Sequence, residues 1–131
     1  PWLAVIFVGC LVVQVFLAGM GAFGKDGFIQ HRDWAYTFGY LVLVNLIVAL
    51  VGRLPRRIVG LTALALVLFA LQSVLVALRE SYPAIAALHA VNGFSILLVS
   101  IVIARDTWPL RKASPAPTPS PEPVVEPSSA G

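Results

Sequence analysis

Four long apolar runs dominate the sequence, and each is long enough to cross a membrane. A helix needs about 20 predominantly apolar residues to span a hydrocarbon core of ~30 Å. The runs occupy approximately residues 2–23, 31–52, 56–78 and 84–105. They are too long for single strands and lack the apolar–polar alternation of a transmembrane barrel. We therefore expect an all-α integral membrane protein.

The composition fits a chain whose main partner is the lipid bilayer. Hydrophobic residues make up 59% of the sequence and charged residues only 11%, against about 25% charged in a typical soluble domain. The net charge of +3 does not indicate nucleic-acid binding, because the basic residues are few and scattered among loops. Cys10 is the only cysteine, so no intramolecular disulfide and no c-type haem motif is possible.

The connections between the runs are short and contain glycine, proline and charged residues. Short loops place consecutive helices antiparallel, so residues 1–112 are expected to form an up-down four-helix bundle. The middle loop carries Arg53, Arg56 and Arg57 without an acidic residue. Because cytoplasmic loops are enriched in Lys and Arg, we expect this loop and both termini in the cytoplasm. The chain starts at Pro1 rather than Met, so a preceding segment is also expected.

Residues 113–131 differ from the rest of the chain. They are rich in proline, serine and alanine, and such a segment cannot bury a core and favours extended or disordered conformations. The expectation is a disordered cytoplasmic tail. A rigid spacer, a proline-rich ligand and a solvated tail without a specific role all remain open for it.

An internal repeat connects the only two histidines of the chain. Gln14 precedes His31 by 17 residues, and Gln72 precedes His89 by the same interval, so one offset of 58 residues superimposes both pairs. The same offset also superimposes several apolar positions: Leu3 and Leu61, Leu17 and Leu75, Ala35 and Gly93, Tyr36 and Phe94. The pattern predicts a duplicated helical hairpin. Its two copies share one orientation and are related by a pseudo-two-fold axis along the membrane normal.

The repeat predicts that the two histidines face each other. Each starts the second helix of its hairpin, so they are expected on diagonal helices, at similar depth, near the outer side. A single histidine there is explained as well by a buried hydrogen bond, but polar residues within spans tend to mark function. Facing side chains in bundle cores hold cofactors, and two neutral imidazoles suit the two sides of a haem iron. Zinc prefers three or four protein ligands and fits less well.

The predicted site is haem b ligated by His31 and His89. Around it we expect Gln14, Gln72, Ala35, Asn92 and Gly93. The glutamines would support the ligands from behind, the small residues would admit the porphyrin, and the asparagine would bond a ligand or ring substituent. Further candidates are Gly39 for space, Phe38 and Phe94 along the ring faces, and Lys25, Arg32 and Arg79 for the propionates.

The stretches "QVFLAGMGAF" with His31, and "QSVLVAL" with "LHAVNG", resemble one four-helix half of a haem A synthase. The resemblance covers about residues 1–104. It implies a His on the second and fourth helices that ligates haem near the outer face. The chain is also similar to a group of small four-helix bacterial membrane proteins with an LHxxNG element, which implies a bacterial plasma membrane. Only one half is present, and no acidic residue well inside a span could act as a proton acceptor, so the resemblance implies haem binding more than haem oxidation, and enzymatic activity stays open.

The function expected is that of a small b-type cytochrome or haem-handling protein with a membrane redox partner or quinone. No catalytic residue is proposed. Glu80 is the only glutamate in the first and third loops, which are expected on the outer side, and it is explained as a capping or solubilising residue. An alternative is a cofactor-free accessory or assembly subunit, for which the glycine-rich "AGMGAFG" suits close helix contact. A four-helix transporter protomer is disfavoured, because proton coupling usually requires an intramembrane carboxylate.

Overall fold

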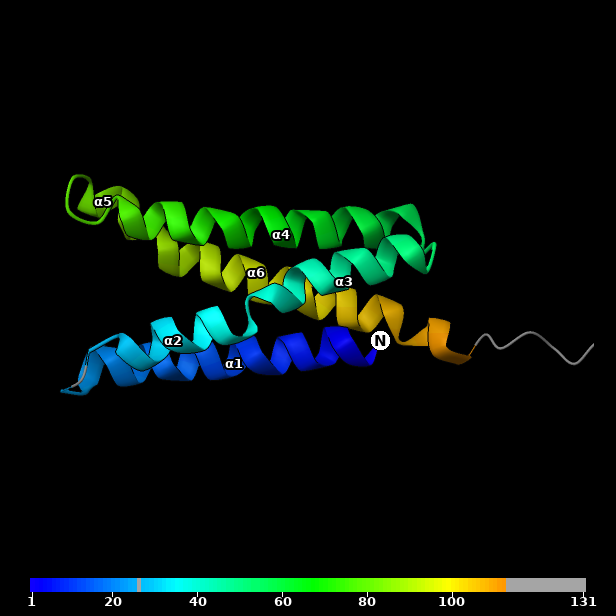
Figure 1. Cartoon of the computed structure of the whole chain (residues 1–131), viewed down its shortest axis with the longest axis horizontal. Coiled ribbons are helices and arrows are strands. Elements are labelled where there is room, and N and C mark those ends of the chain that lie inside the picture. The colour runs from blue at the N-terminus through cyan, green and yellow to red at the C-terminus, as the bar shows by residue number, and fades with distance from the viewer. Residues whose placement is uncertain (26, 113–131) are drawn as a thin grey trace, which may run out of the picture.

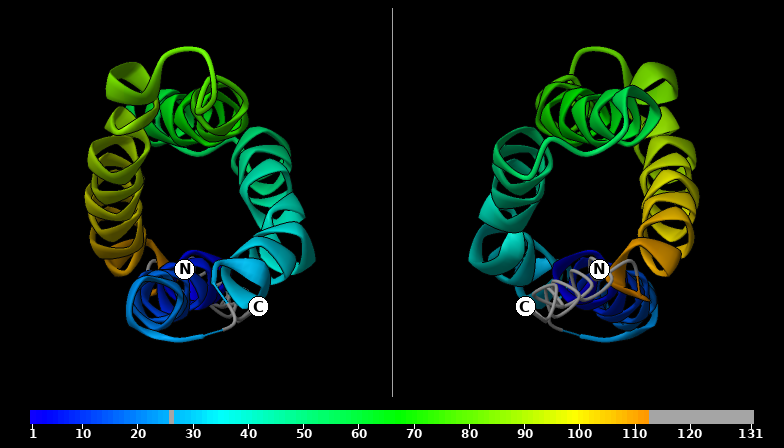
Figure 2. Two further views of the ribbon diagram at one scale, coloured as in Figure 1. Left: turned by 90° about the vertical axis from the view of Figure 1, so that its left-hand side faces the viewer. Right: turned by 90° about the vertical axis from the view of Figure 1, so that its right-hand side faces the viewer.

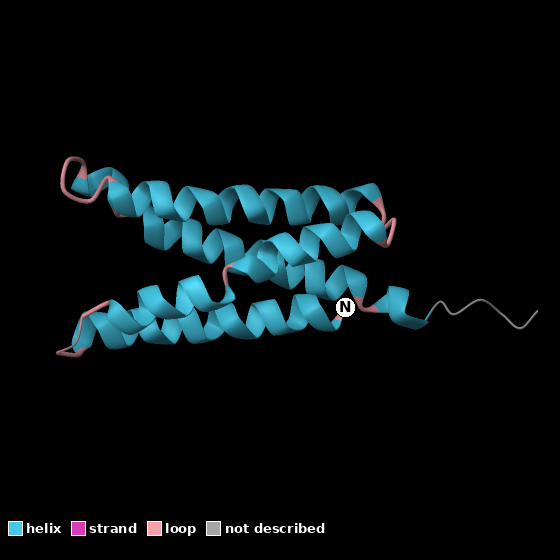
Figure 3. Ribbon diagram, viewed as in Figure 1, coloured by secondary structure: helices cyan, strands magenta, loops and turns pink. Residues whose placement is uncertain are grey.

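A computed structural model describes residues 1–25 and 27–112, and this part of the chain is helical with no strand (Figure 3). The helices are α1 Trp2–Phe23, α2 Ile29–Phe38, α3 Tyr40–Val51, α4 Arg56–Ala77, α5 Pro83–Ala86, α6 Leu88–Thr107 and the 3-10 helix η1 Pro109–Lys112. The tail predicted for residues 113–131 lies outside the described residues.

The helices form four bodies that are long and apolar enough to cross a membrane. They are Trp2–Phe23, Ile29–Val51, Arg56–Ala77 and Pro83–Thr107. Their outer faces remain apolar. Phe16 and Leu98, for example, are each 65% exposed. Contiguous exposure of this kind is rare on soluble proteins and fits a lipid-facing surface. The predicted all-α membrane bundle is confirmed.

Helix breaks interrupt the second and fourth bodies, which the sequence predicted as continuous runs. The first break lies at Gly39, between α2 and α3. A Cβ atom at Gly39 would lie 3.0 Å from the ring of Phe69 on α4, so the missing side chain allows close packing there. The second break lies at Ala87, where the N–H of Ala90 bonds the carbonyl of Ala87 at 3.3 Å. An alanine gives no sequence signal for such a break.

The four bodies surround a common axis (Figure 2). α1 packs against α2, α3 and α6, whereas α4 packs against α3, α5 and α6. Among the described residues, no Cα atom of α2 lies within 8 Å of one in α4, α5 or α6. The end of α1, the start of α2 and the 78–82 turn lie at one end, and the N-terminus, the 52–55 turn and η1 lie at the other (Figure 1). We name these the histidine end and the arginine end, after His31 and His89 and after the arginines of α4 and α6.

Burial repeats with the same 58-residue offset as the sequence. The buried positions that correspond are Ala4 and Thr62, Phe7 and Ala65, Phe38 and Ile96, Val42 and Ser100, and Ala49 and Thr107. Corresponding residues therefore occupy corresponding places in the two hairpins, α1–α3 and α4–α6. This agreement supports the duplicated hairpin independently of the histidines and glutamines.

A small recess lies between the helices and is lined by corresponding residues of both hairpins. Its lining consists of Ala4, Phe7, Val42, Asn45, Thr62, Ala65, Ser100 and Ile103, which form four pairs at the 58-residue offset. The Thr62 hydroxyl donates to the carbonyl of Ile58 at 2.7 Å, and the Asn45 amide donates to that of Leu41 at 2.9 Å. The hydroxyl of Ser100 is buried and has no hydrogen-bond partner within the part of the chain that the structure describes.

Replacement of Ser100 by alanine is expected to leave stability unchanged or to raise it by up to about 1 kcal/mol, because an unpaired buried hydroxyl carries a desolvation cost. Thermal unfolding of the purified protein in detergent measures the effect. Ser95→Ala on the same helix is the matched control, since the Ser95 hydroxyl donates to the carbonyl of Val91 at 3.1 Å. A loss of more than about 1 kcal/mol for Ser100→Ala would contradict the assignment of an unpaired hydroxyl.

Candidate functional site

The two histidines meet between the hairpins at the histidine end. His31 lies on α2 and His89 on α6, and their ring centroids are 6.1 Å apart with the planes inclined by 68°. Among the described residues, no Cα atoms of α2 and α6 approach within 8 Å. The imidazoles therefore bridge diagonal helices through side chains alone. The predicted meeting of the two histidines is confirmed as geometry.

His31 is held on both ring nitrogens by Gln14 of α1. Its Nδ1 lies 3.0 Å from the backbone carbonyl oxygen of Gln14, and its Nε2 lies 3.1 Å from the side-chain Nε2 of the same residue. A carbonyl oxygen only accepts, so Nδ1 carries the proton and donates. Nε2 is then the unprotonated nitrogen and accepts the amide N–H. Gln14 thus selects the tautomer in which Nε2 of His31 carries the lone pair.

His89 repeats half of this arrangement. Its Nδ1 lies 3.4 Å from the backbone carbonyl oxygen of Gln72, which is longer than a typical N–H···O bond. The tautomer is the same as that of His31, for the same reason. The Gln72 side chain differs from that of Gln14, because its Oε1 accepts from Asn92 Nδ2 at 2.8 Å.

Asn92 and Trp34 occupy corresponding positions and have corresponding roles. Asn92 Nδ2 donates to the carbonyl of Leu68 at 2.8 Å, and Trp34 Nε1 donates to that of Cys10 at 3.0 Å. Each bond spans 24 residues and joins the two helices of one hairpin. The sequence predicted that Asn92 bonds a ligand. The structure instead directs both of its amide hydrogens to α4, so Asn92 positions Gln72.

The Trp34 bond was not predicted, because tryptophan and asparagine are different residue types and do not count as a match at the 58-residue offset. An indole has a single N–H donor, and Trp34 uses it on Cys10. Trp34 therefore cannot do for Gln14 what Asn92 does for Gln72. The side-chain oxygen Oε1 of Gln14 is buried and has no hydrogen-bond partner among the described residues.

Asn92→Leu is expected to lower the free energy of unfolding by about 1–2 kcal/mol, because two bonds to α4 are lost and Gln72 Oε1 loses its donor. Chemical or thermal unfolding in detergent measures this loss. Asn45→Leu is the matched control, since Asn45 donates only to Leu41 of its own helix. Equal losses in the two variants would show that the bonds to α4 contribute nothing specific.

The space expected beside the small residues is occupied by protein. A Cβ atom at Gly93 would lie 3.2 Å from Nε2 of Gln72, and at Gly39 the ring of Phe69 takes the space. Ala35 is partly buried and packs against the core. No slot is open at these positions in this arrangement, and the expectation that they admit a porphyrin stays a prediction. Gly93 admits the Gln72 side chain.

The two phenylalanines proposed to flank a bound ring lie elsewhere. Phe38 is 3% exposed and packs against Phe7, Trp34 and Phe69, with ring centroids 5.8–6.0 Å apart. Phe94 is 56% exposed and lies on the bundle surface. That part of the predicted site is wrong because helical spacing alone does not tell a core phenylalanine from a surface one.

Phe28 is an aromatic neighbour of His31 that the sequence did not reveal. Its ring lies edge-on to the imidazole with centroids 6.1 Å apart. A Cβ atom at Gly21 would lie 2.6 Å from Cδ1 of Phe28. Gly21, in the glycine-rich segment of α1, therefore lets the Phe28 ring lie against this helix. This glycine was the sequence signal from which close packing of a neighbour here could have been predicted.

The charged residues near the histidine end pair with their sequence neighbours. Arg32 bonds Asp33 at 2.9 Å, and Arg79 approaches Glu80 at 3.4 Å, with all four side chains more than half exposed. Lys25 is exposed as well. Such exposed pairs contribute little to stability, so these cations remain accessible to an anionic group. The surroundings of Glu80 agree with its reading as a solubilising residue.

No group of three or more His, Cys, Asp or Glu side chains gathers within the described ranges. A metal held at the histidine pair therefore has two protein ligands at most.

Fold and site together define a four-helix membrane bundle with a histidine–glutamine pair in each hairpin. Residues 14–78 match the model of a family of unknown function, DUF6220. The match covers just under half of the chain, from Gln14 past Gln72, and it includes His31 but ends before His89. No curated protein and no solved structure matches the chain.

Proposed function

We propose that this protein binds one haem b between His31 and His89 and acts in electron transfer or haem handling. One observation carries the proposal: both imidazoles direct Nδ1 to the carbonyl of a repeat-related glutamine, at 3.0 Å and 3.4 Å. This bond to the nitrogen distal from the metal is the usual way in which a protein orients a ligating histidine. It makes Nε2 of each ring the nitrogen that binds iron.

The spacing of the rings supports the same assignment. Two imidazoles on opposite sides of one metal, each bonded at about 2 Å, have ring centres about 6 Å apart. The centroids of His31 and His89 are 6.1 Å apart. The 68° angle between the ring planes is compatible with this arrangement, because two imidazoles on one metal can be rotated relative to each other about the axis through their Nε2 atoms.

Entry of a flat cofactor between the histidines requires side chains to move. Gln14 has to release Nε2 of His31, since amide and metal compete for one lone pair. Gln72 has to leave the space beside Gly93. Among the described residues, no Cα atom of α2 lies within 8 Å of one in α4, α5 or α6, so side chains alone join α2 to the second hairpin.

Bound haem supplies a one-electron redox centre whose potential depends on its ligands and their hydrogen bonds. The protein's part is to orient both imidazoles through the Gln14 and Gln72 carbonyls and to keep the site within apolar helices. The site lies near one end of the bundle, so electron movement across the bilayer needs a membrane redox partner or a quinone.

The arginine count and the resemblance extend the proposal to location. Arg53, Arg56 and Arg57 favour a cytoplasmic arginine end, which puts both ends of residues 1–112 in the cytoplasm and the histidines toward the outer side of a bacterial plasma membrane. A reporter fused after Arg57 should read cytoplasmic, and an external reading would invert this topology. The resemblance to one half of a haem A synthase supports haem ligation.

The proposal is tested by a reduced-minus-oxidised absorption spectrum of protein purified from cells supplied with haem. A Soret band and a sharp alpha band, typical of six-coordinate low-spin b-type haem, are expected. Their absence from folded, haem-supplied protein would end the proposal.

The alternative is a cofactor-free accessory or assembly subunit. It is favoured by the Gln14 side chain, which already satisfies Nε2 of His31, so the first histidine is fully bonded without a cofactor. In that case the histidines and glutamines act as interhelical bonds. A haem-free spectrum together with copurification of a defined membrane complex would select this alternative.

A further inference from the structure

A hollow of about 430 Å³ lies at the arginine end of the second hairpin. It is formed where α4 begins and α6 passes into η1. Its lining includes Arg57 and Ile58 of α4, Arg105 and Asp106 of α6, and Leu110 of η1. The hollow is far from the histidines along the bundle, and the proposed haem site makes no use of it.

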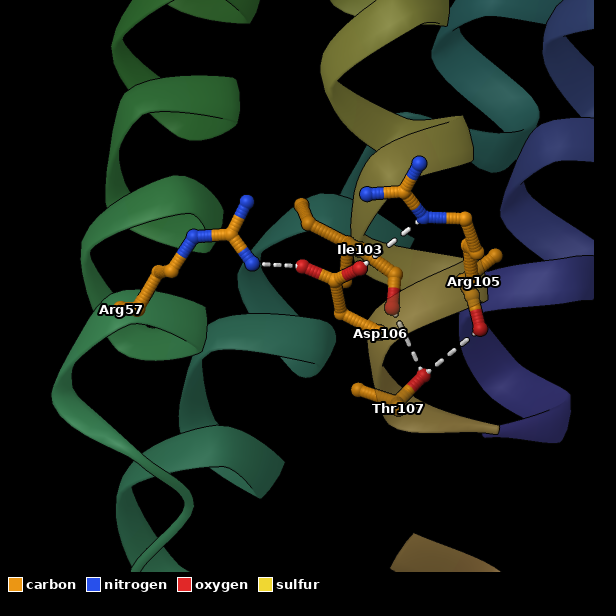
Figure 4. A network of polar contacts seen from close by, with 6 residues as sticks. Arg57, Ile103, Arg105, Asp106 and Thr107 are labelled. Carbon is orange, nitrogen blue, oxygen red and sulfur yellow. Dashed lines mark hydrogen bonds and ion pairs between the residues drawn. The ribbon is translucent and has the colours of Figure 1, made fainter. Parts of the chain in front are cut away.

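One carboxylate holds the two arginines of the hollow (Figure 4). Asp106 accepts from Nη1 of Arg57, and its other oxygen accepts from Nε of Arg105 at 3.1 Å. A guanidinium has five N–H donors in a planar fork, so each arginine keeps further donors beyond those given to Asp106. The arginine side chains are 65% and 71% exposed, whereas that of Asp106 is 14% exposed. The lining therefore carries a net positive charge with its donors on the accessible side.

The hollow combines this charge with apolar walls at a membrane interface. Ile58 is buried, Leu110 is 41% exposed, and two prolines complete the lining. Trp2 and Trp108 meet edge-on at the same end, with ring centroids 5.1 Å apart, and tryptophan is typical of the headgroup level of a bilayer. A ligand that fits such walls has an anionic head and an apolar body.

This feature does not belong to the duplicated scaffold. In the first hairpin, Ile47 and Val48 occupy the positions that correspond to Arg105 and Asp106. The second hairpin alone therefore carries the arginine–aspartate–arginine arrangement, although the packing of the two hairpins is otherwise related. Bundle packing does not require it.

We propose that this hollow binds the phosphate of an anionic phospholipid. Arg57 and Arg105 donate to the phosphate oxygens, a geometry for which the guanidinium fork is well suited. Basic pockets between transmembrane helices recognise anionic headgroups in this way. Ile58 and Leu110 contact the glycerol and upper acyl carbons. These apolar contacts favour a lipid over free phosphate.

Native mass spectrometry of the purified full chain tests the proposal with phosphatidylglycerol, phosphatidylcholine and inorganic phosphate as separate probes. Phosphatidylglycerol should be retained at least tenfold more than phosphatidylcholine. Arg57→Gln and Arg105→Gln should each reduce its retention about tenfold. Arg56→Gln is the matched control, since Arg56 starts the same helix but does not line the hollow, and it should stay within twofold of the parent protein.

Arg57→Lys keeps the charge and covers the case in which Arg57→Gln fails to fold. It should lose several-fold in retention because the ammonium lacks the planar fork. The stabilisation that phosphatidylglycerol gives in thermal unfolding should shrink in parallel. Equal retention of both lipids, or equal losses in the Arg56 and Arg57 variants, would overturn the site. Saturable binding of inorganic phosphate with the same arginine dependence would overturn the lipid assignment.

Discussion

His31→Ala and His89→Ala are each expected to abolish the low-spin haem spectrum. In the proposed site, each variant removes one of the two imidazoles that would hold the iron, and the remaining one would hold it only weakly. We expect loss of the alpha band and at least a tenfold fall in haem per protein, measured by absorption and by extraction of the haem. The two losses should be alike, because the repeat gives both histidines the same carbonyl-oriented geometry.

Two control variants separate ligand loss from damage to the bundle. Gln30→Ala changes an exposed side chain next to His31 and should leave the spectrum unchanged. Gln14→Leu removes the amide that occupies Nε2 of His31 but keeps the backbone carbonyl that bonds Nδ1. Haem occupancy should therefore be retained in Gln14→Leu. Low-spin haem that persists in His31→Ala or in His89→Ala would refute the ligand assignment.

The meeting of the histidines could be predicted because it depends on the repeat alone. Two rare residue types in register fix which helices correspond, and antiparallel hairpins then place His31 and His89 at one end. The hydrogen bonds could not be predicted in the same way. Trp34 and Asn92 make corresponding interhelical bonds, but they share no chemical group except an N–H donor. A comparison of residue types 58 positions apart therefore misses this pair.

Glycine positions show a different limit of the sequence. The absence of a side chain at Gly93 indicates space beside the helix, but the sequence does not state which neighbour fills it. The structure gives that space to the Gln72 amide. The same holds at Gly39, where Phe69 closes the gap and the helix breaks. The neighbour that fills such a gap depends on the rotamers of residues 20 to 30 positions away along the chain.

The repeat also predicts how large and small buried side chains are distributed between the two hairpins. Phe7 on α1 is 3% exposed and Ala65 on α4 is 1% exposed, and both line the recess between the hairpins. They correspond at the 58-residue offset, so a pseudo-two-fold axis exchanges the two positions. One position is large and the other small, as complementary packing across an axis requires.

Phe7→Ala should therefore lower the free energy of unfolding by about 3–5 kcal/mol, since it empties a buried aromatic position. Ala65→Phe alone should cost about 1–3 kcal/mol, because the added ring meets Phe7 and overfills the core. Unfolding of both variants in detergent measures these losses. Phe16→Ala is the control for loss of a phenyl group, as Phe16 is 65% exposed on the same helix and its loss should be small.

The double variant Phe7→Ala with Ala65→Phe should regain part of the stability lost by Phe7→Ala. The ring is moved to the position related by the axis, where it replaces the volume that was removed. Phe7 packs against Phe38 and Phe69, with centroids 5.8 Å and 6.4 Å apart, whereas the corresponding neighbours of position 65 are Ile96 and Leu11. Aromatic edge contacts are thus exchanged for aliphatic ones, so recovery should be incomplete. Losses that simply add in the double variant would show that the two positions do not share one space, and the repeat would then describe the sequence without describing the packing of the core.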